Sequence, residues 1–199
     1  MKRSLKSSIL HLIQCKMVDL YASLRMNEPA QAIAIGSSAG GIDALSQIIK
    51  SLNPTFQLPI FITQHIGATS ENYLVHHLDK LTHLRVKEAT DKEQICQGTV
   101  YLAPPNYHLL IEEDFSITLT VDEKVSYARP SIDVMFETAA RAYQQRLVAV
   151  ILTGANNDGT AGAAVVKEFG GKIIAQDPAS AYIATMPQSV ITNVGADLV

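Results

Sequence analysis

The chain has 199 residues, of which 47% are hydrophobic and 18% are charged, and its formal net charge is −3. This length and composition provide enough apolar residues for the continuous core of one α/β domain, which excludes global disorder. Nucleic-acid binding needs a basic surface, and a slightly acidic chain does not offer one. The two cysteines, Cys15 and Cys96, have neither metal-site nor redox spacing. We therefore expect a reduced, cytoplasmic protein without a disulfide framework.

The N-terminus is basic and then briefly apolar. Three basic residues within the first six precede the apolar residues 9–13, which is the outline of a secretory signal. His11 interrupts the apolar run, no small-residue cleavage pattern follows it, and it is too short to cross a bilayer. We therefore predict no membrane insertion but an amphipathic helix over about residues 4–25. This helix would form an N-terminal appendage, residues 1–30, ahead of a domain of residues 31–199.

The stretch from Ala32 to Leu45 predicts a strand, a tight turn and a helix. An apolar run stops at Gly36, two serines follow, and apolar residues recur at helical spacing after Gly41. A serine at such a turn, here Ser38, points off the sheet edge beside the free N–H groups of the new helix, which suits a nucleophile next to an anion site. The same glycines suit a phosphate or dinucleotide cradle, and a merely tight turn is a third interpretation. The turn alone does not choose among the three.

The remaining elements follow from apolar runs and apolar stripes. Further strands are predicted at residues 59–63, 147–152 and 172–175, and helices at about 42–52, 70–81, 132–143, 160–169 and from 187 towards 193. Four short alternating segments, at residues 84–87, 99–103, 109–112 and 116–120, predict an antiparallel insertion with a β-hairpin. Together these elements predict an α/β fold: a doubly wound, mostly parallel sheet with helices on both faces and an antiparallel β-hairpin insertion.

Polar residues stand where three of the predicted strands end. Ser38 follows the first strand, His65 the second, and Asp158 follows the strand at 147–152. Because the carboxyl ends of parallel strands share one edge of a sheet, these three side chains can meet. An imidazole makes a serine hydroxyl nucleophilic by taking its proton, and a carboxylate orients the imidazole. Taken singly, however, Ser38 and Asp158 are also typical helix-cap or turn residues, and His65 is a typical hydrogen-bonded core histidine.

Short blocks of sequence, in order over roughly residues 31–198, share the pattern of a known family. The blocks are Ile35–Gly41, Gln64-His65, Gly98–Pro104, Arg129–Phe136, Leu152–Gly154 with Asp158-Gly159, Gly170-Gly171, Ala175–Asp177 and Met186-Pro187. Together they resemble the catalytic domain of the chemotaxis protein-glutamate methylesterase (CheB) family. The resemblance implies that Ser38 is the nucleophile, His65 the base and Asp158 the carboxylate that orients the base.

The resemblance also implies a reaction and a partner. The expected enzyme is a carboxylic ester hydrolase that removes methyl groups from glutamate γ-methyl esters on methyl-accepting chemotaxis receptors, with deamidation of glutamine as a related activity. Backbone N–H groups of Ala39, Gly40 and Ala155 would form the oxyanion hole. The mechanism needs no metal and no cofactor. Arg129, just before a predicted helix, is the candidate contact for the acidic receptor helix.

Three departures from the family pattern keep other interpretations open. Ala39 stands where threonine is frequent, as in methylesterase domains fused to methyltransferases, and Ala155 and Asn156 stand where Met-Gly is usual. Members usually carry an N-terminal receiver domain, which about thirty residues before Ile33 cannot hold. A second interpretation is therefore a binding module of weak or no activity in a signalling pathway. A nucleotide-binding protein is a third, although the turn lacks the glycine spacing and the lysine of phosphate-binding loops.

Overall fold

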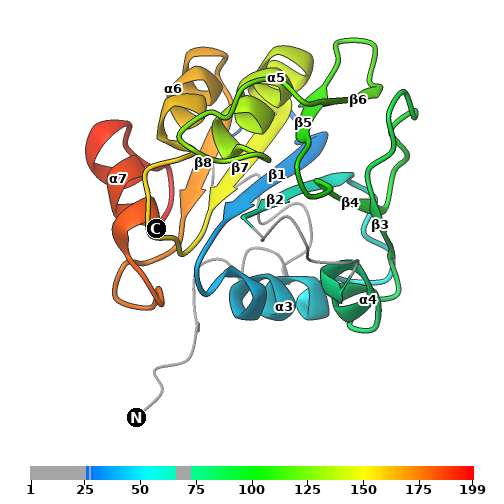
Figure 1. The fold of residues 1–199 in the computed structure, drawn as a ribbon, viewed down its shortest axis with the longest axis horizontal. Coiled ribbons are helices and arrows are strands. Elements are labelled where there is room, and N and C mark those ends of the chain that lie inside the picture. The colour runs from blue at the N-terminus through cyan, green and yellow to red at the C-terminus, as the bar shows by residue number, and fades with distance from the viewer. Residues whose placement is uncertain (1–25, 27, 66–72) are drawn as a thin grey trace.

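The computed structural model describes residue 26, residues 28–65 and residues 73–199, and it shows a sheet between two layers of helices (Figure 1). The main sheet has the order β3-β4-β2-β1-β7-β8, and all its paired strands are parallel. Its strands are β1 (Ala32–Ser37), β2 (Ile60–Gln64), β3 (Arg85–Glu88), β4 (Thr99–Leu102), β7 (Leu147–Ile151) and β8 (Lys172–Ala175). A separate antiparallel pair consists of β5 (His108–Ile111) and β6 (Ile117–Thr120).

The helices cover both faces of this sheet. They are α3 (Gly41–Ser51), α4 (Tyr73–Asp79), α5 (Ile132–Tyr143), which continues into the short η1 (Gln144–Arg146), α6 (Thr160–Glu168) and α7 (Thr185–Asn193). In Figure 1, α3 and α4 lie on one side of the sheet and α5 and α6 on the other. The predicted doubly wound fold is therefore confirmed.

Alternation along the strands divides the core into two halves. In β1, Ile33 and Ile35 point to the layer of α3 and α4, whereas Ala32 and Ala34 point to the layer of α5. Successive side chains of a strand face opposite sides, so one strand supplies both cores. At Gly36 a β-carbon would collide with the side chain of Ile132 at the start of α5. The glycine that ends the apolar run therefore allows α5 to begin close to the carboxyl edge of the sheet.

The extent of the predicted antiparallel insertion was wrong. β3 and β4 belong to the main sheet, where β4 pairs in parallel with both β2 and β3, and only β5 and β6 form an antiparallel hairpin. A short alternating strand at the margin of a parallel sheet has the same pattern as a hairpin strand, and only its partner distinguishes the two. The hairpin packs on α5, where the Thr138 hydroxyl accepts a hydrogen bond from Ile111 N at 3.1 Å.

Two predictions fall partly or wholly outside the described residues. The N-terminal helix at residues 4–25 lies outside them, and of the helix predicted from residue 70 the structure describes α4. None of the helices that the structure describes is long and apolar enough to span a membrane.

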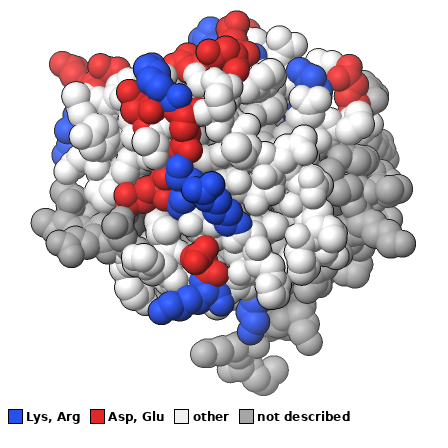
Figure 2. Space-filling view, turned by 90° about the vertical axis from the view of Figure 1, so that its right-hand side faces the viewer, with Lys and Arg blue, Asp and Glu red and all other residues white. Residues whose placement is uncertain are grey.

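On the side of the molecule that carries β3, basic and acidic side chains lie next to one another (Figure 2). One ion pair of β3 is Lys87–Glu93, whose charged atoms are 2.5 Å apart.

Candidate active site

His65 and Asp158 form a hydrogen-bonded pair at the carboxyl edge of the sheet. His65 directly follows β2, and its backbone N–H continues the pairing with β1 by donating to Ser37 O at 3.0 Å. Its Nε2 lies 2.8 Å from Oδ2 of Asp158, which is in the loop between β7 and α6. The side chain of Asp158 is fully buried, and that of His65 is 15% exposed. The two residues that the sequence placed at separate strand ends therefore meet, with only the histidine open to solvent.

The start of α5 holds the Asp158 carboxylate. Besides His65, Oδ2 accepts a hydrogen bond from Ile132 N at 2.8 Å. Oδ1 accepts from the Ser131 hydroxyl at 2.9 Å and from the backbone N–H groups of Asp133 and Gly159, both at 3.0 Å. The N–H groups of Ile132 and Asp133 are ones that the N-terminus of α5 leaves without partners, so the carboxylate of a distant loop caps α5.

The protonation state of this pair follows from its surroundings. Burial acts to raise the pKa of Asp158, but the hydrogen bonds from His65, Ile132 and Asp133 outweigh burial and lower the pKa below its ordinary value. An ionised carboxylate only accepts hydrogen bonds, so Nε2 of His65 carries the proton that is donated to Asp158. Nδ1 of the neutral imidazole is therefore the nitrogen that can accept a proton from a substrate or a nucleophile.

Asp133 is a second buried carboxyl beside this pair. Burial, together with the negative charge of Asp158, raises its pKa to about 6. Its Oδ1 accepts a hydrogen bond from Gly162 N in α6 at 2.7 Å. Asp133 thus links α5 to α6 and places a titrating group next to Asp158.

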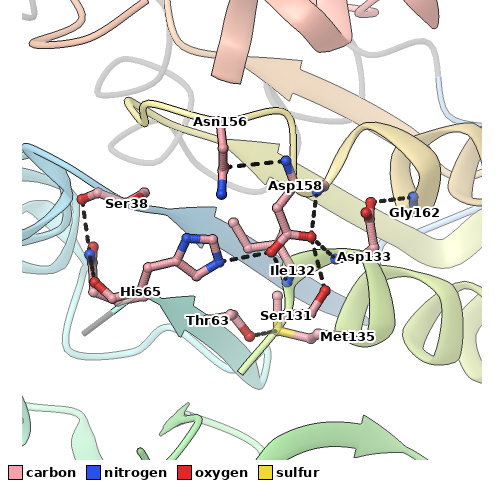
Figure 3. A network of polar contacts seen from close by, with 12 residues as sticks. Ser38, Thr63, His65, Ser131, Ile132, Asp133, Met135, Asn156, Asp158 and Gly162 are labelled. Atoms are coloured by element: carbon pink, nitrogen blue, oxygen red, sulfur yellow. Dashed lines mark hydrogen bonds and ion pairs between the residues drawn. The ribbon is translucent and has the colours of Figure 1, made fainter. Parts of the chain in front are cut away.

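The turn that carries Ser38 is fixed from both sides. Ser38 N donates to Thr153 O at 2.9 Å, and Ser38 O accepts from Gly41 N at 2.8 Å and from Gln64 Nε2 at 2.9 Å. Gly40, at φ 78°, is the N-cap residue of α3. The alternative interpretation of Ser38 as the helix cap is therefore wrong. Its hydroxyl makes no hydrogen bond to any described residue, and in Figure 3 the ring of His65 lies between Ser38 and Asp158.

Two turns next to Ser38 contain backbone N–H groups without a described acceptor. Those of Ala39, Gly40 and Ala155 donate to no acceptor within the described part of the chain. A β-carbon on Gly154 would come within 3.0 Å of the Ser38 β-carbon, so the loop after β7 passes directly beside the serine. Unpaired N–H groups next to a hydroxyl can stabilise an oxyanion that forms there.

Arg129, the predicted substrate contact, is half-buried at the end of the loop that follows β6. Its Nη1 donates to Val121 O at 2.6 Å and to Asp122 O at 2.9 Å. This end of the guanidinium therefore holds the loop of residues 121–128. Contact of Arg129 with a substrate stays a prediction.

Three site residues were missed or misread in the sequence. Ser131 is the N-cap residue of α5, but its side chain makes no cap hydrogen bond and its hydroxyl donates to Asp158 instead. Gln64 bridges the carbonyls of Ser38 and His65 through Nε2, each at 2.9 Å. Asn156 accepts from Asp158 N at 3.3 Å through its side-chain oxygen (Figure 3). Gln64 and Ser131 lie within the family-like blocks, which was the one indication available without a structure.

No cluster of three or more metal-ligating side chains is present in the residues that the structure describes. Within the described residues, a parallel α/β sheet carries a serine turn and a His–Asp pair at one edge, an arrangement typical of the class of hydrolases that use a serine nucleophile. Within this class, the family model for the CheB methylesterase matches residues 33–199, and the chain belongs to that family. Its members are hydrolases of carboxylic esters.

Individual relatives agree with this assignment. A Leptospira interrogans protein, provisionally named protein-glutamate methylesterase/protein-glutamine glutaminase, is 50% identical over 169 residues, covering 85% of this chain and 88% of its own. A Thermotoga maritima protein named protein-glutamate methylesterase/protein-glutamine glutaminase is 38% identical over 88% of this chain and 53% of its own. The crystal structure of the Thermotoga maritima CheB methylesterase catalytic domain superposes with a TM-score of 0.81 at 38% identity, over 85% of this chain and 91% of that domain.

Proposed function

We propose that this chain is a protein-glutamate methylesterase that hydrolyses glutamate γ-methyl esters on methyl-accepting chemotaxis receptors. The observation that carries the proposal is the 2.8 Å contact between His65 and the buried Asp158, beside the turn that presents Ser38. The names of related proteins support a glutamate ester of a protein as the substrate. The receptor is the partner that the CheB resemblance implies. A cytoplasmic location is part of the same proposal.

The first half of the reaction is acyl transfer to Ser38. The Ser38 hydroxyl gives its proton to Nδ1 of His65 while its oxygen bonds to the γ-carbonyl carbon of the methylated glutamate. The carbonyl oxygen becomes an oxyanion, which the N–H groups of Ala39, Gly40 and Ala155 stabilise. The Asp158 carboxylate favours the imidazolium that forms at His65. His65 then protonates the departing methoxide, and methanol leaves.

The second half releases the free glutamate. A water molecule gives a proton to Nδ1 of His65 and attacks the acyl carbon, and the Ser38 oxygen leaves with the proton that His65 returns. The side chains named here balance every proton transfer, so no further group is needed. Attack on a glutamine side chain by the same route would release ammonia, and the names of the relatives include this glutaminase activity. Arg129 is the proposed contact for acidic residues of the substrate helix.

A methanol-release assay on methylated receptor, run beside p-nitrophenyl ester hydrolysis, tests the proposal. Ser38→Ala should abolish both activities and the labelling of the protein by a serine-directed phosphonate, whereas the fold should persist. Ser51→Ala, at the far end of α3, is the matched control and should retain both activities. The competing function, a binding module without activity, predicts that the unmodified chain shows no burst with the activated ester and no labelling. Retained turnover in Ser38→Ala would refute the role given to this serine.

A further inference from the structure

A buried polar chain continues behind Asp158, away from the reacting atoms. It runs from the Asp158 carboxylate through Ser131 to His108 on β5, and ends at the backbone of Glu123. Ser131 is fully buried and His108 is 1% exposed. Buried polar groups need partners, and every link of this chain is hydrogen bonded. The hydrolytic steps described above use neither Ser131 nor His108.

His108 is held as one neutral tautomer. Its Nδ1 lies 3.2 Å from Ser131 N, which is a donor, so Nδ1 accepts this hydrogen bond. Its Nε2 lies 3.0 Å from the carbonyl oxygen of Glu123, which is an acceptor, so Nε2 carries the proton and donates it. The imidazole therefore connects the residue before α5 with the loop of residues 121–128.

The backbone and the side chain of Ser131 are both fixed by hydrogen bonds. Its N–H donates to His108, its hydroxyl donates to Oδ1 of Asp158 at 2.9 Å, and its carbonyl accepts from Met135 N at 3.4 Å. The hydroxyl is the one side-chain donor to Oδ1 among the described residues, since the other two donors are backbone N–H groups. With Oδ1 held in this way, Oδ2 is the oxygen that faces His65.

We propose that Ser131 and His108 are positioning residues for the hydrolytic reaction, in which His108 orients Ser131 and Ser131 orients the Asp158 carboxylate toward His65. The kinetic tests of this inference rest on the proposed function, whereas its NMR test does not. A purely structural role would instead confine His108 to anchoring the loop at Glu123. Four titratable groups of the described residues belong to this network or contact it. They are Asp133 on α5, Asp158 in the β7–α6 loop, His65 after β2 and His108 on β5.

Ser131→Ala tests the first link. The variant loses the hydroxyl donor to Asp158 and keeps the N–H that donates to His108. Loss of a hydrogen bond to a charged group typically changes a rate or equilibrium constant about tenfold or more. We therefore expect kcat for a p-nitrophenyl ester to fall about tenfold with KM unchanged. The acidic limb of the pH–rate profile should move to higher pH, because a carboxylate with one donor fewer holds the imidazolium more strongly. Ser131→Thr restores a hydroxyl and should restore kcat and the profile.

Two variants of His108 separate positioning from loop anchoring. In His108→Asn the amide oxygen can replace Nδ1 as the acceptor for Ser131 N, but the contact with Glu123 is lost. In His108→Gln the longer side chain can replace Nε2 as the donor to Glu123, but the contact with Ser131 is lost. Positioning predicts that His108→Asn keeps most of kcat and that His108→Gln falls about tenfold. The reverse order would overturn the proposal, and thermal unfolding by circular dichroism confirms that the variants compared are folded.

A spectroscopic measurement makes the inference independent of ester hydrolysis. The proton that His65 Nε2 donates to Asp158 should give a low-field ¹H NMR signal. Ser131→Ala should shift this signal, and Ser131→Thr should return it to its original position. If the natural chain hydrolyses no ester but Ser131→Ala shifts its signal, the proposed function fails and the orienting of Asp158 by Ser131 stands. If the natural chain is active, and Ser131→Ala leaves kcat, the pH profile and the signal unchanged, the positioning role is refuted and the proposed function stands.

Discussion

Replacing Asp158 with asparagine changes the charge at the centre of the site while keeping the size of the side chain. Oδ1 accepts three hydrogen bonds, from Ser131, Asp133 and Gly159, and Oδ2 accepts two, from His65 and Ile132. The asparagine has only one side-chain oxygen. This oxygen keeps three hydrogen-bond donors if it takes the place of Oδ1, but only two if it takes the place of Oδ2. Its NH₂ group then faces His65 Nε2 and Ile132 N, where acceptors are needed.

Two costs follow from this geometry. His65 must accept through Nε2, so its proton moves to Nδ1, which can no longer take the proton of Ser38. In the general Ser-His-Asp mechanism, the wrong tautomer lowers kcat about 10⁴-fold, or about 5 kcal/mol in the barrier. The N–H of Ile132 is left buried without an acceptor, at about 1 to 3 kcal/mol. With the negative charge at the start of α5 also lost, we expect the free energy of unfolding to fall by about 1 to 4 kcal/mol.

The assay combines p-nitrophenyl ester kinetics with urea unfolding of the same variant. Asp197→Asn is the matched control, because Asp197 pairs with Lys172 at 3.1 Å at the amino end of β8, away from the site. We expect it to keep the kcat of the unmodified chain. If folded Asp158→Asn protein keeps kcat within about threefold of the unmodified chain, the assignment of the His65 tautomer and of the orienting role of Asp158 is wrong.

Two further predictions concern Asp133 and Arg129. Because the pKa of Asp133 in the fold, about 6, lies above its ordinary 3.8, its contribution to stability is fully present below pH 3.8 and is lost as the pH rises through 6. Between about pH 4.5 and pH 7 the unmodified chain should therefore lose about 1 to 2 kcal/mol of unfolding free energy that Asp133→Asn does not lose. Urea titrations at both pH values measure this, and parallel pH dependences would contradict it. Arg129→Gln should raise KM for methylated receptor about threefold and leave p-nitrophenyl ester kinetics unchanged; an equal loss with both substrates would show that Arg129 acts on the loop instead.

Local sequence pattern was sufficient where a residue's environment depends on its neighbours in the chain. The apolar run at residues 147–152 corresponds to β7, and the stripe at residues 132–143 corresponds to α5. Periodicity also placed Ser38, His65 and Asp158 at strand ends, because a parallel sheet brings its carboxyl ends to one edge. It could not assign β3 and β4 to the main sheet, since their partner strands are not encoded in their own alternation.

The sequence by itself determined the alternating layers and the sheet edge at which the site lies, because apolar periodicity and strand ends are local properties. The roles proposed for Ser38, His65 and Asp158 came from the family-like blocks. Only the tertiary structure decided which atoms meet. It pairs Nε2 of His65 with Asp158, and it gives the N–H groups at the start of α5 that carboxylate as their acceptor rather than the Ser131 hydroxyl. It also places buried His108 behind Ser131. These contacts join residues up to 93 positions apart, and hydrogen bonds over such separations depend on how helices pack on the sheet.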